Sequence, residues 1–165
     1  MPNSALEGRL IIVCGLPGSG KTTLATVLEG RLGAIRFSAD DWLNALSLDL
    51  YEAVARERIE SLQWELARKL LALGLTVIVE WGTWGRSERD ALRHGARNLG
   101  AAVELHVLHA EADVLFERIQ RRGAENPPIA RDDLDRWVQL FEEPTAEELA
   151  LYDPPSEGGG SDGKS

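Results

Sequence analysis

The stretch "GLPGSGKTT" at residues 15–23 follows directly on the apolar run "RLIIVC" at residues 9–14. Because glycine has no Cβ atom, a loop that carries Gly15, Gly18 and Gly20 can turn its backbone N–H groups inward and admit a bulky anion. The next residues, "KTTLATVLEGRL", repeat apolar side chains at helical spacing, and the partial positive charge of a helix N-terminus also favours an anion. The stretch therefore predicts a phosphate-binding loop between a strand and a helix.

The same stretch fits the pattern G-x-x-x-x-G-K-[ST], whose residues have known roles. Lys21 is expected to reach the β- and γ-phosphates of a nucleotide and to act in catalysis, while Thr22 offers its hydroxyl to Mg²⁺. The predicted nucleotide-binding residues are Gly15, Pro17, Gly18, Ser19, Gly20, Lys21, Thr22 and Thr23.

Length, charge and cysteine content limit the class of protein. A chain of 165 residues with 44% apolar residues is the size of one domain. The net charge of -9 repels polyphosphates at long range and argues against binding of nucleic acid. Cys14 is the only cysteine, so the chain forms no intrachain disulfide, as is usual in a reducing compartment. Since the longest apolar runs are only about five residues and no signal-like segment begins the chain, we expect a cytoplasmic protein with no membrane partner.

Strand-like runs alternate with helical patterns along the chain, which favours a mostly parallel α/β sheet. The predicted strands cover residues 10–14, 34–37, 75–79 and 102–108. The predicted helices after the first one cover residues 50–73, 87–99, 112–122 and 132–141.

Periodicity and turn residues set the ends of these helices. An apolar stripe is expected on the helix at 50–73, which Gly74 closes. Ser87 and Asp90 resemble a capping box at the start of the next helix, and Gly123 ends the one after it. The stripe consists of Ile59, Leu62, Leu66, Leu70 and Leu73.

Residues 153–165, "DPPSEGGGSDGKS", contain almost no apolar side chains. Such a segment has little to offset the cost of ordering, so we expect a disordered acidic and glycine-rich tail. The predicted domain therefore covers residues 1–152.

Carboxylates follow two of the predicted strands. Asp40 and Asp41 come after the run at 34–37, and Glu80 comes after the run at 75–79. Because the carboxyl ends of parallel strands meet at one edge of a sheet, these side chains should lie near the phosphate loop. A kinase needs a carboxylate to accept a proton from the attacking hydroxyl and acidic groups to hold the metal. We expect Asp40 and Asp41 at the substrate and Glu80 with Thr22 at the metal; an alternative for one of the two aspartates is the N-cap of the next helix.

Aromatic and basic residues near the same edge have two interpretations each. Trp81 and Trp84 lie in a glycine-flanked loop, where they could bind substrate by stacking or form part of the core. Arg118, Arg121 and Arg122 share a helix face, which is either a solvated surface with a Glu117–Arg121 pair or a lid that brings arginines to the transferred phosphoryl group.

With these residues placed, the chain resembles the small P-loop kinases grouped with the AAA-type ATP-binding proteins, which include polynucleotide kinase domains, zeta-toxin-like kinases and antibiotic phosphotransferases. The resemblance implies that Asp40, the first Asp of the "DDW" motif, is the catalytic base and that Arg118 or Arg122 is the lid arginine. It also implies ATP rather than GTP, since no N-K-x-D motif occurs in the chain. The matching stretches are "GLPGSGKTTLA", "FSADDW", the strand that ends in Glu80, "LFERIQRRG" and "FEEPTAEE".

The expected fold is an α/β P-loop three-layer sandwich with a helical lid and a short, mostly parallel sheet of about four or five strands. Two features depart from the relatives: the third strand ends in Glu80 and "WGTWG" rather than in Asp, and no fifth strand follows the proline-rich segment.

The function expected first is transfer of the γ-phosphoryl group of Mg-ATP to a hydroxyl of a small molecule, such as a metabolite, nucleoside, sugar or antibiotic. A 5′-hydroxyl polynucleotide kinase is a second possibility, which the net charge and the lack of a basic stripe disfavour. A third is a regulatory switch that hydrolyses ATP. The sequence does not indicate which acceptor is used or whether the chain forms oligomers.

Overall fold

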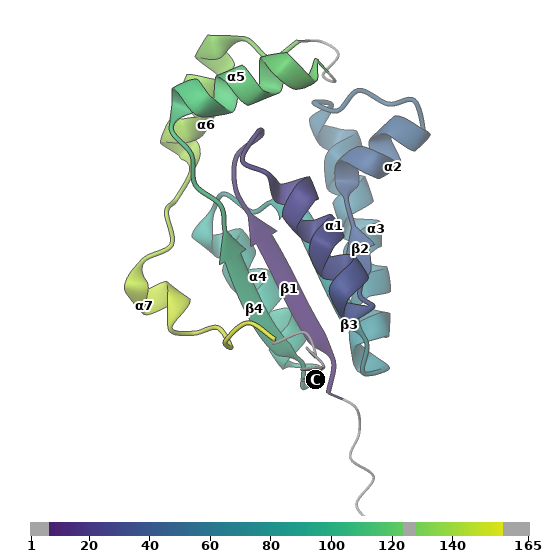
Figure 1. Ribbon diagram of the computed structural model, residues 1–165. Helices are drawn as coiled ribbons and strands as arrows, with labels where there is room; N and C mark the ends of the chain where they lie inside the picture. Colours follow the sequence, from purple (N-terminus) through teal and green to yellow (C-terminus); the bar gives the residue numbers. More distant parts are fainter. Residues whose placement is uncertain (1–6, 124–127, 157–165) are drawn as a thin grey trace, which may run out of the picture.

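The computed structural model describes residues 7–123 and 128–156. Four strands form one parallel sheet in the order β2-β3-β1-β4 (Figure 1). The strands are β1 (Arg9–Cys14), β2 (Ile35–Phe37), β3 (Thr76–Gly82) and β4 (Ala102–Val107). The helices are α1 (Lys21–Leu32), α2 (Ala39–Ala45), α3 (Ala53–Ala72), α4 (Arg86–Arg97), α5 (Ala112–Arg122), α6 (Arg131–Leu140) and α7 (Ala146–Leu149). This arrangement confirms the predicted parallel α/β fold.

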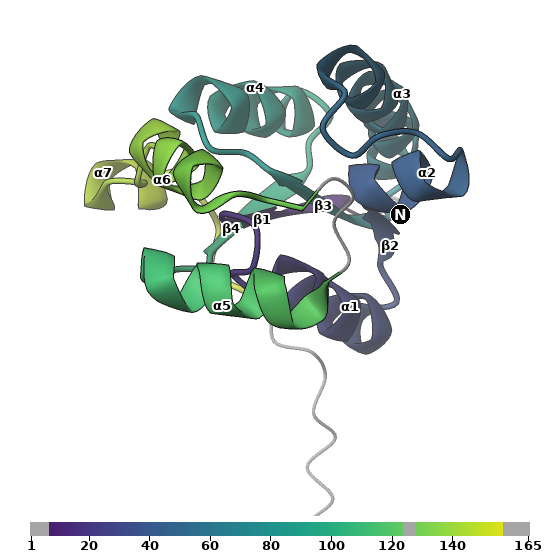
Figure 2. The same ribbon diagram turned by 90° about the horizontal axis from the view of Figure 1, so that it is seen from above.

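The sheet is covered by helices on both faces, which explains why β1 reads as a continuous apolar run. Leu10 and Ile12 pack toward the residues of α3 and α4, whereas Ile11 and Val13 pack toward α1. All four side chains are fully buried. The view in Figure 2 shows α3 and α4 on one face and α1 and α5 on the other, so the structure is the three-layer sandwich that was expected.

The predicted apolar stripe on α3 is wrong at three of its five positions, whereas Ile59 is buried and Leu70 packs partly against the core. Leu62, Leu66 and Leu73 are 56%, 43% and 70% exposed. The buried face of the helix carries Ile59 together with Gln63, Ala67 and Leu71. A prediction based on large apolar residues does not find this face, because a glutamine and an alanine occupy two of its positions.

Three predicted local features also differ from the structure. The side chain of Ser38, and not that of Asp40 or Asp41, caps α2 by accepting a hydrogen bond from the backbone N–H of Asp41. Gly85 is the N-cap of α4, so the helix begins before Ser87 and the proposed capping box does not form. The strand β3 continues to Gly82, which places Trp81 in the sheet rather than in a loop.

The end of the domain was predicted too early. The backbone N–H of Asp153 donates to Val103 O at 2.7 Å, and its carboxylate accepts from the Val103 N–H and from Arg97. Ser156 donates to the buried carboxylate of Glu104. Residues 153–156 therefore pack on β4 and α4, and the rest of the predicted tail lies outside the described residues. Across 7–123 and 128–156, every helix is too short or too polar to cross a bilayer.

Candidate active site

The phosphate loop follows β1 and ends at the first turn of α1, as predicted. Its turn closes with a hydrogen bond from Ser19 N to Leu16 O at 3.1 Å. Gly18 and Gly20 have φ values of 80° and 98°, which other residues rarely adopt. Apart from its two chain neighbours, no described residue has an atom within 4 Å of the place where a Cβ of Gly20 would stand, so the backbone is open to a ligand there.

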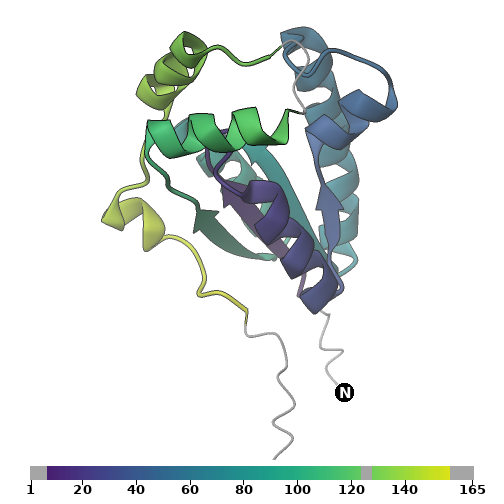
Figure 3. The same ribbon diagram turned by 45° about the horizontal axis from the view of Figure 1, so that its top comes forward.

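Helix α5 lies across this loop, as Figure 3 shows. A Cβ atom on Gly18 would stand 2.8 Å from Leu115 O and 3.1 Å from Ile119 Cγ1, so only glycine allows this close approach. Arg118 donates from Nη1 to Gly18 O at 3.3 Å. The helix that was expected as a lid is thus packed on the loop, and Arg118 contacts the backbone of the loop.

Lys21 folds back over the loop and donates from Nζ to Leu16 O at 3.1 Å. Burial lowers the pKa of Lys21 to about 8, although the nearby charges of Asp40 and Glu80 act in the opposite direction. Arg122 adds a smaller effect that lowers this pKa further. Two cations therefore converge where the β- and γ-phosphates of a nucleotide would lie.

A cavity of about 740 Å³ extends from the loop to a chamber between α3, the end of β3 and α4. It contains eleven of the predicted site residues, whereas Gly15, Ser19, Asp41 and Arg118 do not line it. The eleven are Pro17, Gly18, Gly20, Lys21, Thr22, Thr23, Asp40, Glu80, Trp81, Trp84 and Arg122.

Arg36 on β2 joins two of the predicted acids. It donates from Nη1 to Glu80 Oε1 at 2.6 Å and from Nη2 to Asp41 Oδ2 at 2.8 Å. The side chain of Glu80 is only 2% exposed, and burial raises its pKa while Arg36 lowers it. Asp41 thus pairs with Arg36 and does not line the cavity.

The residues present fit a magnesium ion bound chiefly by nucleotide phosphates. Glu80 borders the cavity, and its buried Oε2 has no hydrogen-bond partner among the described residues. Thr22 borders the same cavity at the start of α1. Within 7–123 and 128–156, no group of three or more His, Cys, Asp or Glu side chains could hold a metal by itself. Mg²⁺ at a nucleotide is usually bound by only one or two protein groups, together with phosphate oxygens and waters. The few oxygen ligands available here fit that pattern.

Asp40 points to the cavity at the start of α2 and forms an ion pair with Arg56 of α3. Its side chain is 58% exposed, so it remains accessible to a ligand. Arg56 is held in turn by Leu50 O, at 3.2 Å from Nε, and lies 3.5 Å from Glu60. The sequence interpretation missed Arg56, because its helical position resembles that of any exposed charge.

Trp81 forms part of the cavity wall and is held by a buried glutamine. Its Nε1 donates to Gln63 Oε1 at 2.7 Å, and Gln63 Nε2 donates to Ser38 O at 2.9 Å. Gln63 is fully buried. These two hydrogen bonds link Trp81 to Ser38, the N-cap of α2. Asp40 lies in the first turn of the same helix. Gln63 was not predicted, although its spacing of four residues from Ile59 and Ala67 is a sequence signal for a buried position.

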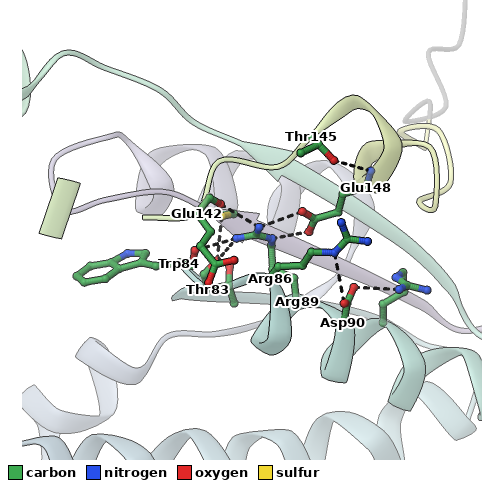
Figure 4. Close-up of polar contacts among 10 residues, drawn as sticks. Thr83, Trp84, Arg86, Arg89, Asp90, Glu142, Thr145 and Glu148 are labelled. Carbon is green, nitrogen blue, oxygen red and sulfur yellow. Dashed lines mark hydrogen bonds and ion pairs between the residues drawn. The ribbon is translucent and has the colours of Figure 1, made fainter. Parts of the chain in front are cut away.

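Arg89 holds the turn that follows β3 (Figure 4). Its guanidinium makes five hydrogen bonds, which satisfy all five of its N–H groups. The acceptors are Thr83 O, Trp84 O, Glu142 O and both carboxylate oxygens of Glu148. The segment at 142–148 is thereby fixed to the end of β3.

The turn held by Arg89 contacts the phosphate loop directly. Thr83 has a φ of 50°, which is uncommon for a residue with a branched side chain. The next residue, Trp84, donates from its indole Nε1 to Gly15 O at 3.2 Å. Arg89 was missed in the sequence, yet it shares the buried face of α4 with Leu92 and Ala96, and an arginine in such a stripe indicates a buried ionic partner.

The sheet, the glycine-rich turn and the following helix define a P-loop nucleotide-binding fold. A family model described as an AAA domain (AAA_33) matches residues 10–144. The chain belongs to this family, which confirms the resemblance found in the sequence.

Curated relatives and solved structures agree with this assignment. A shikimate kinase from Rhizobium leguminosarum bv. trifolii is 28% identical over 132 residues, which cover 78% of this chain and 64% of that protein. A gluconokinase from Arabidopsis thaliana is 25% identical over 132 residues, covering 73% of this chain and 70% of that protein. The chain thus spans slightly less than two thirds of the shikimate kinase. The crystal structure of a gluconokinase from Sinorhizobium meliloti 1021 has the same fold, with a TM-score of 0.60 at 23% identity, covering 86% of this chain and 79% of that one.

Proposed function

We propose that the protein transfers the γ-phosphoryl group of Mg-ATP to a hydroxyl of a small molecule bound in the cavity. The observation that carries this proposal is that one cavity joins the phosphate loop, the carboxylate of Asp40 and a wall of aromatic side chains. Similarity to two curated small-molecule kinases supports kinase chemistry and favours neither a polynucleotide kinase nor an ATP-hydrolysing switch.

Asp40 is proposed as the general base. The acceptor oxygen attacks the γ-phosphorus, the bond from that phosphorus to the β,γ-bridging oxygen breaks, and ADP leaves with the electron pair. The proton of the acceptor hydroxyl passes to the Asp40 carboxylate. The ion pair with Arg56 supports this role because it orients the carboxylate at the cavity edge.

The phosphates are proposed to lie against the loop, with Lys21 and Arg122 as the cationic contacts. Arg122 lines the cavity, whereas Arg118 bonds to the backbone of the loop and does not line the cavity. This difference favours Arg122 as the lid arginine that contacts phosphate. Thr22 and Glu80 would hold Mg²⁺, which neutralises charge on the β- and γ-phosphates. Glu80 would contribute its carboxylate to this site.

The acceptor is proposed to lie between α3, β3 and α4, with Trp81 and Trp84 as part of its wall. Trp81 is oriented by Gln63 and Trp84 by the loop itself. Asp41, which was expected at the substrate, is better explained as the partner that keeps Arg36 on Glu80.

The proposal is tested by Lys21→Ala, assayed with γ-labelled ATP and a panel of hydroxylated metabolites. Loss of the charge that stabilises the transferred phosphoryl group should lower transfer by about 10²-fold or more. Lys69→Ala is the matched control, since that side chain is 68% exposed and pairs with Glu65 on the surface. Normal transfer by Lys21→Ala with a native circular dichroism spectrum would contradict the assignment of the loop.

A further inference from the structure

The chamber beside the phosphate loop is lined by many aromatic side chains. Four of the five tryptophans of the chain line the cavity, together with Tyr51. Trp64 and Trp81 meet edge to face with ring centroids 6.5 Å apart, and Trp137 lies 5.8 Å from both Tyr51 and Trp84. Aromatic faces that surround a cavity attract cations as well as apolar rings.

The same chamber has a surplus of carboxylates. One face of α3 turns toward the cavity and carries Glu57 and Glu60, one turn apart, and α4 contributes Glu88. The only basic side chain on the α3 and α4 walls of the cavity, among the residues that the structure describes, is Arg56. Since Arg56 pairs with Asp40 and lies 3.5 Å from Glu60, it offers little to an acidic acceptor.

Glu60 is half-buried among other charged side chains of this chamber, with a side chain that is 29% exposed. Burial raises the pKa of Glu60 to about 7, and the charges of Glu88 and Asp40 raise it further against the effect of Arg56. A positive group in the chamber would relieve this crowding of negative charge.

We infer that the hydroxyl acceptor is a ring-bearing compound that carries an ammonium group, such as an amino sugar, aminocyclitol or amino-nucleoside. The inference rests on the proposed function and names the substrate class of the same site. The ring lies against Trp81 and Trp84, and the ammonium lies near Glu57, Glu60 and Glu88. The nucleotide phosphates occupy the opposite end, where Lys21 and Arg122 supply the positive charge.

The test uses matched acceptors that differ in charge on the same ring. Glucosamine, N-acetylglucosamine and glucuronate form one set; an aminocyclitol and an amino-nucleoside are each paired with an N-acetylated form. ADP formation and binding by calorimetry are measured in the presence of Mg-ATP. For at least one set, the amine should have a kcat/KM at least tenfold above that of the neutral form, and an acid should be poorer still. Preference for neutral or acidic members, or failure of every amine to bind and react, would overturn the inference.

Variants separate the charge effect from damage to the enzyme. Glu60→Gln combined with Glu88→Gln should reduce the preference for the amine at least tenfold while the KM for ATP stays within twofold. Glu65→Gln, on the exposed side of α3, is the control and should leave the preference unchanged. If ATP binds and its γ-phosphoryl group is transferred to neutral acceptors only, this inference fails and the proposed kinase function stands. If ATP neither binds nor transfers a phosphoryl group to any acceptor, the proposed function itself fails.

Discussion

Arg89 and Glu148 form an ion pair with Nε and Oε1 2.6 Å apart, and their side chains are only 0% and 1% exposed. The pair joins α4 to α7 across the turn that carries Trp84. A buried pair of this kind is costly to break, because removing one partner leaves the other charge without solvent or a counter-ion.

Arg89→Ala should therefore destabilise the protein by roughly 3–5 kcal/mol, which for a chain of this size corresponds to a fall in Tm of roughly 10 °C. Glu148→Ala combined with Arg89→Ala should cost less than the sum of the single changes, since the two side chains share one interaction. Arg121→Ala is the matched control: its pair with Glu117 is 76% and 66% exposed and should contribute less than about 1 kcal/mol. Thermal unfolding by circular dichroism measures the wild type, both single variants, the double variant and the control. An Arg89→Ala variant with the Tm of the wild type would refute the account.

Asp153→Ala should lower the Tm by a few degrees. It removes a charge-assisted hydrogen bond to Arg97 at 2.6 Å and another to the backbone N–H of Val103 at 2.7 Å, each worth roughly 1.5–3 kcal/mol at most for a partly exposed group. This expectation differs from the one drawn from the sequence, in which residues from 153 onward form a disordered tail. Glu65→Ala on the surface is the comparison, and equal melting temperatures for the two variants would restore the earlier view.

The affinity for Mg-ATP should fall as the pH rises through about 8. Burial lowers the pKa of Lys21 to about 8, so the free enzyme carries the positive charge below that pH and loses it above. Titration of the dissociation constant between about pH 7 and 9 should show this decline. Lys21→Arg keeps its charge throughout the range and should bind weakly with no such slope. A flat wild-type profile would mean that the lysine retains an ordinary pKa.

Asp40→Asn should reduce kcat by roughly 10²-fold or more and leave the KM for ATP little changed, because an amide cannot accept the acceptor's proton. Asp41→Asn serves as the matched variant, since Asp41 bonds to Arg36 and does not line the cavity. Its effect on kcat should be less than tenfold. If the two variants behave in the opposite way, Asp41 is the base and Asp40 has a structural role.

Much of the fold was predictable because it depends on local patterns. The strand before the loop, the extent of α5 and its end at Gly123 follow from apolar runs and from a single glycine with positive φ. The capping of α2 was assigned to the wrong residue, because Ser38 and the two aspartates are all good N-caps and only the backbone geometry distinguishes them.

Many of the predicted site residues line one cavity in the structure. The buried side chains that hold the site residues in place were not predicted. Lys21, Asp40 and Glu80 border one cavity because the carboxyl ends of parallel strands share an edge. Gln63, which orients Trp81, and Arg89, which holds the turn that carries Trp84, are buried polar side chains. Their partners Trp81 and Glu148 lie 18 and 59 residues away in the sequence. Spacing rules describe one helix or strand at a time, so they cannot reveal such partners.

The fate of the γ-phosphoryl label in a single turnover tests the central claim most directly. The wild type is mixed with γ-labelled Mg-ATP and the panel of hydroxylated acceptors, and the products are separated. The account predicts that the label moves to an acceptor hydroxyl in amounts equal to the ADP formed, and that Lys21→Ala and Asp40→Asn each suppress this transfer. Label that appears only as inorganic phosphate, at a rate that no acceptor changes, would contradict a kinase and leave an ATP-hydrolysing switch as the function.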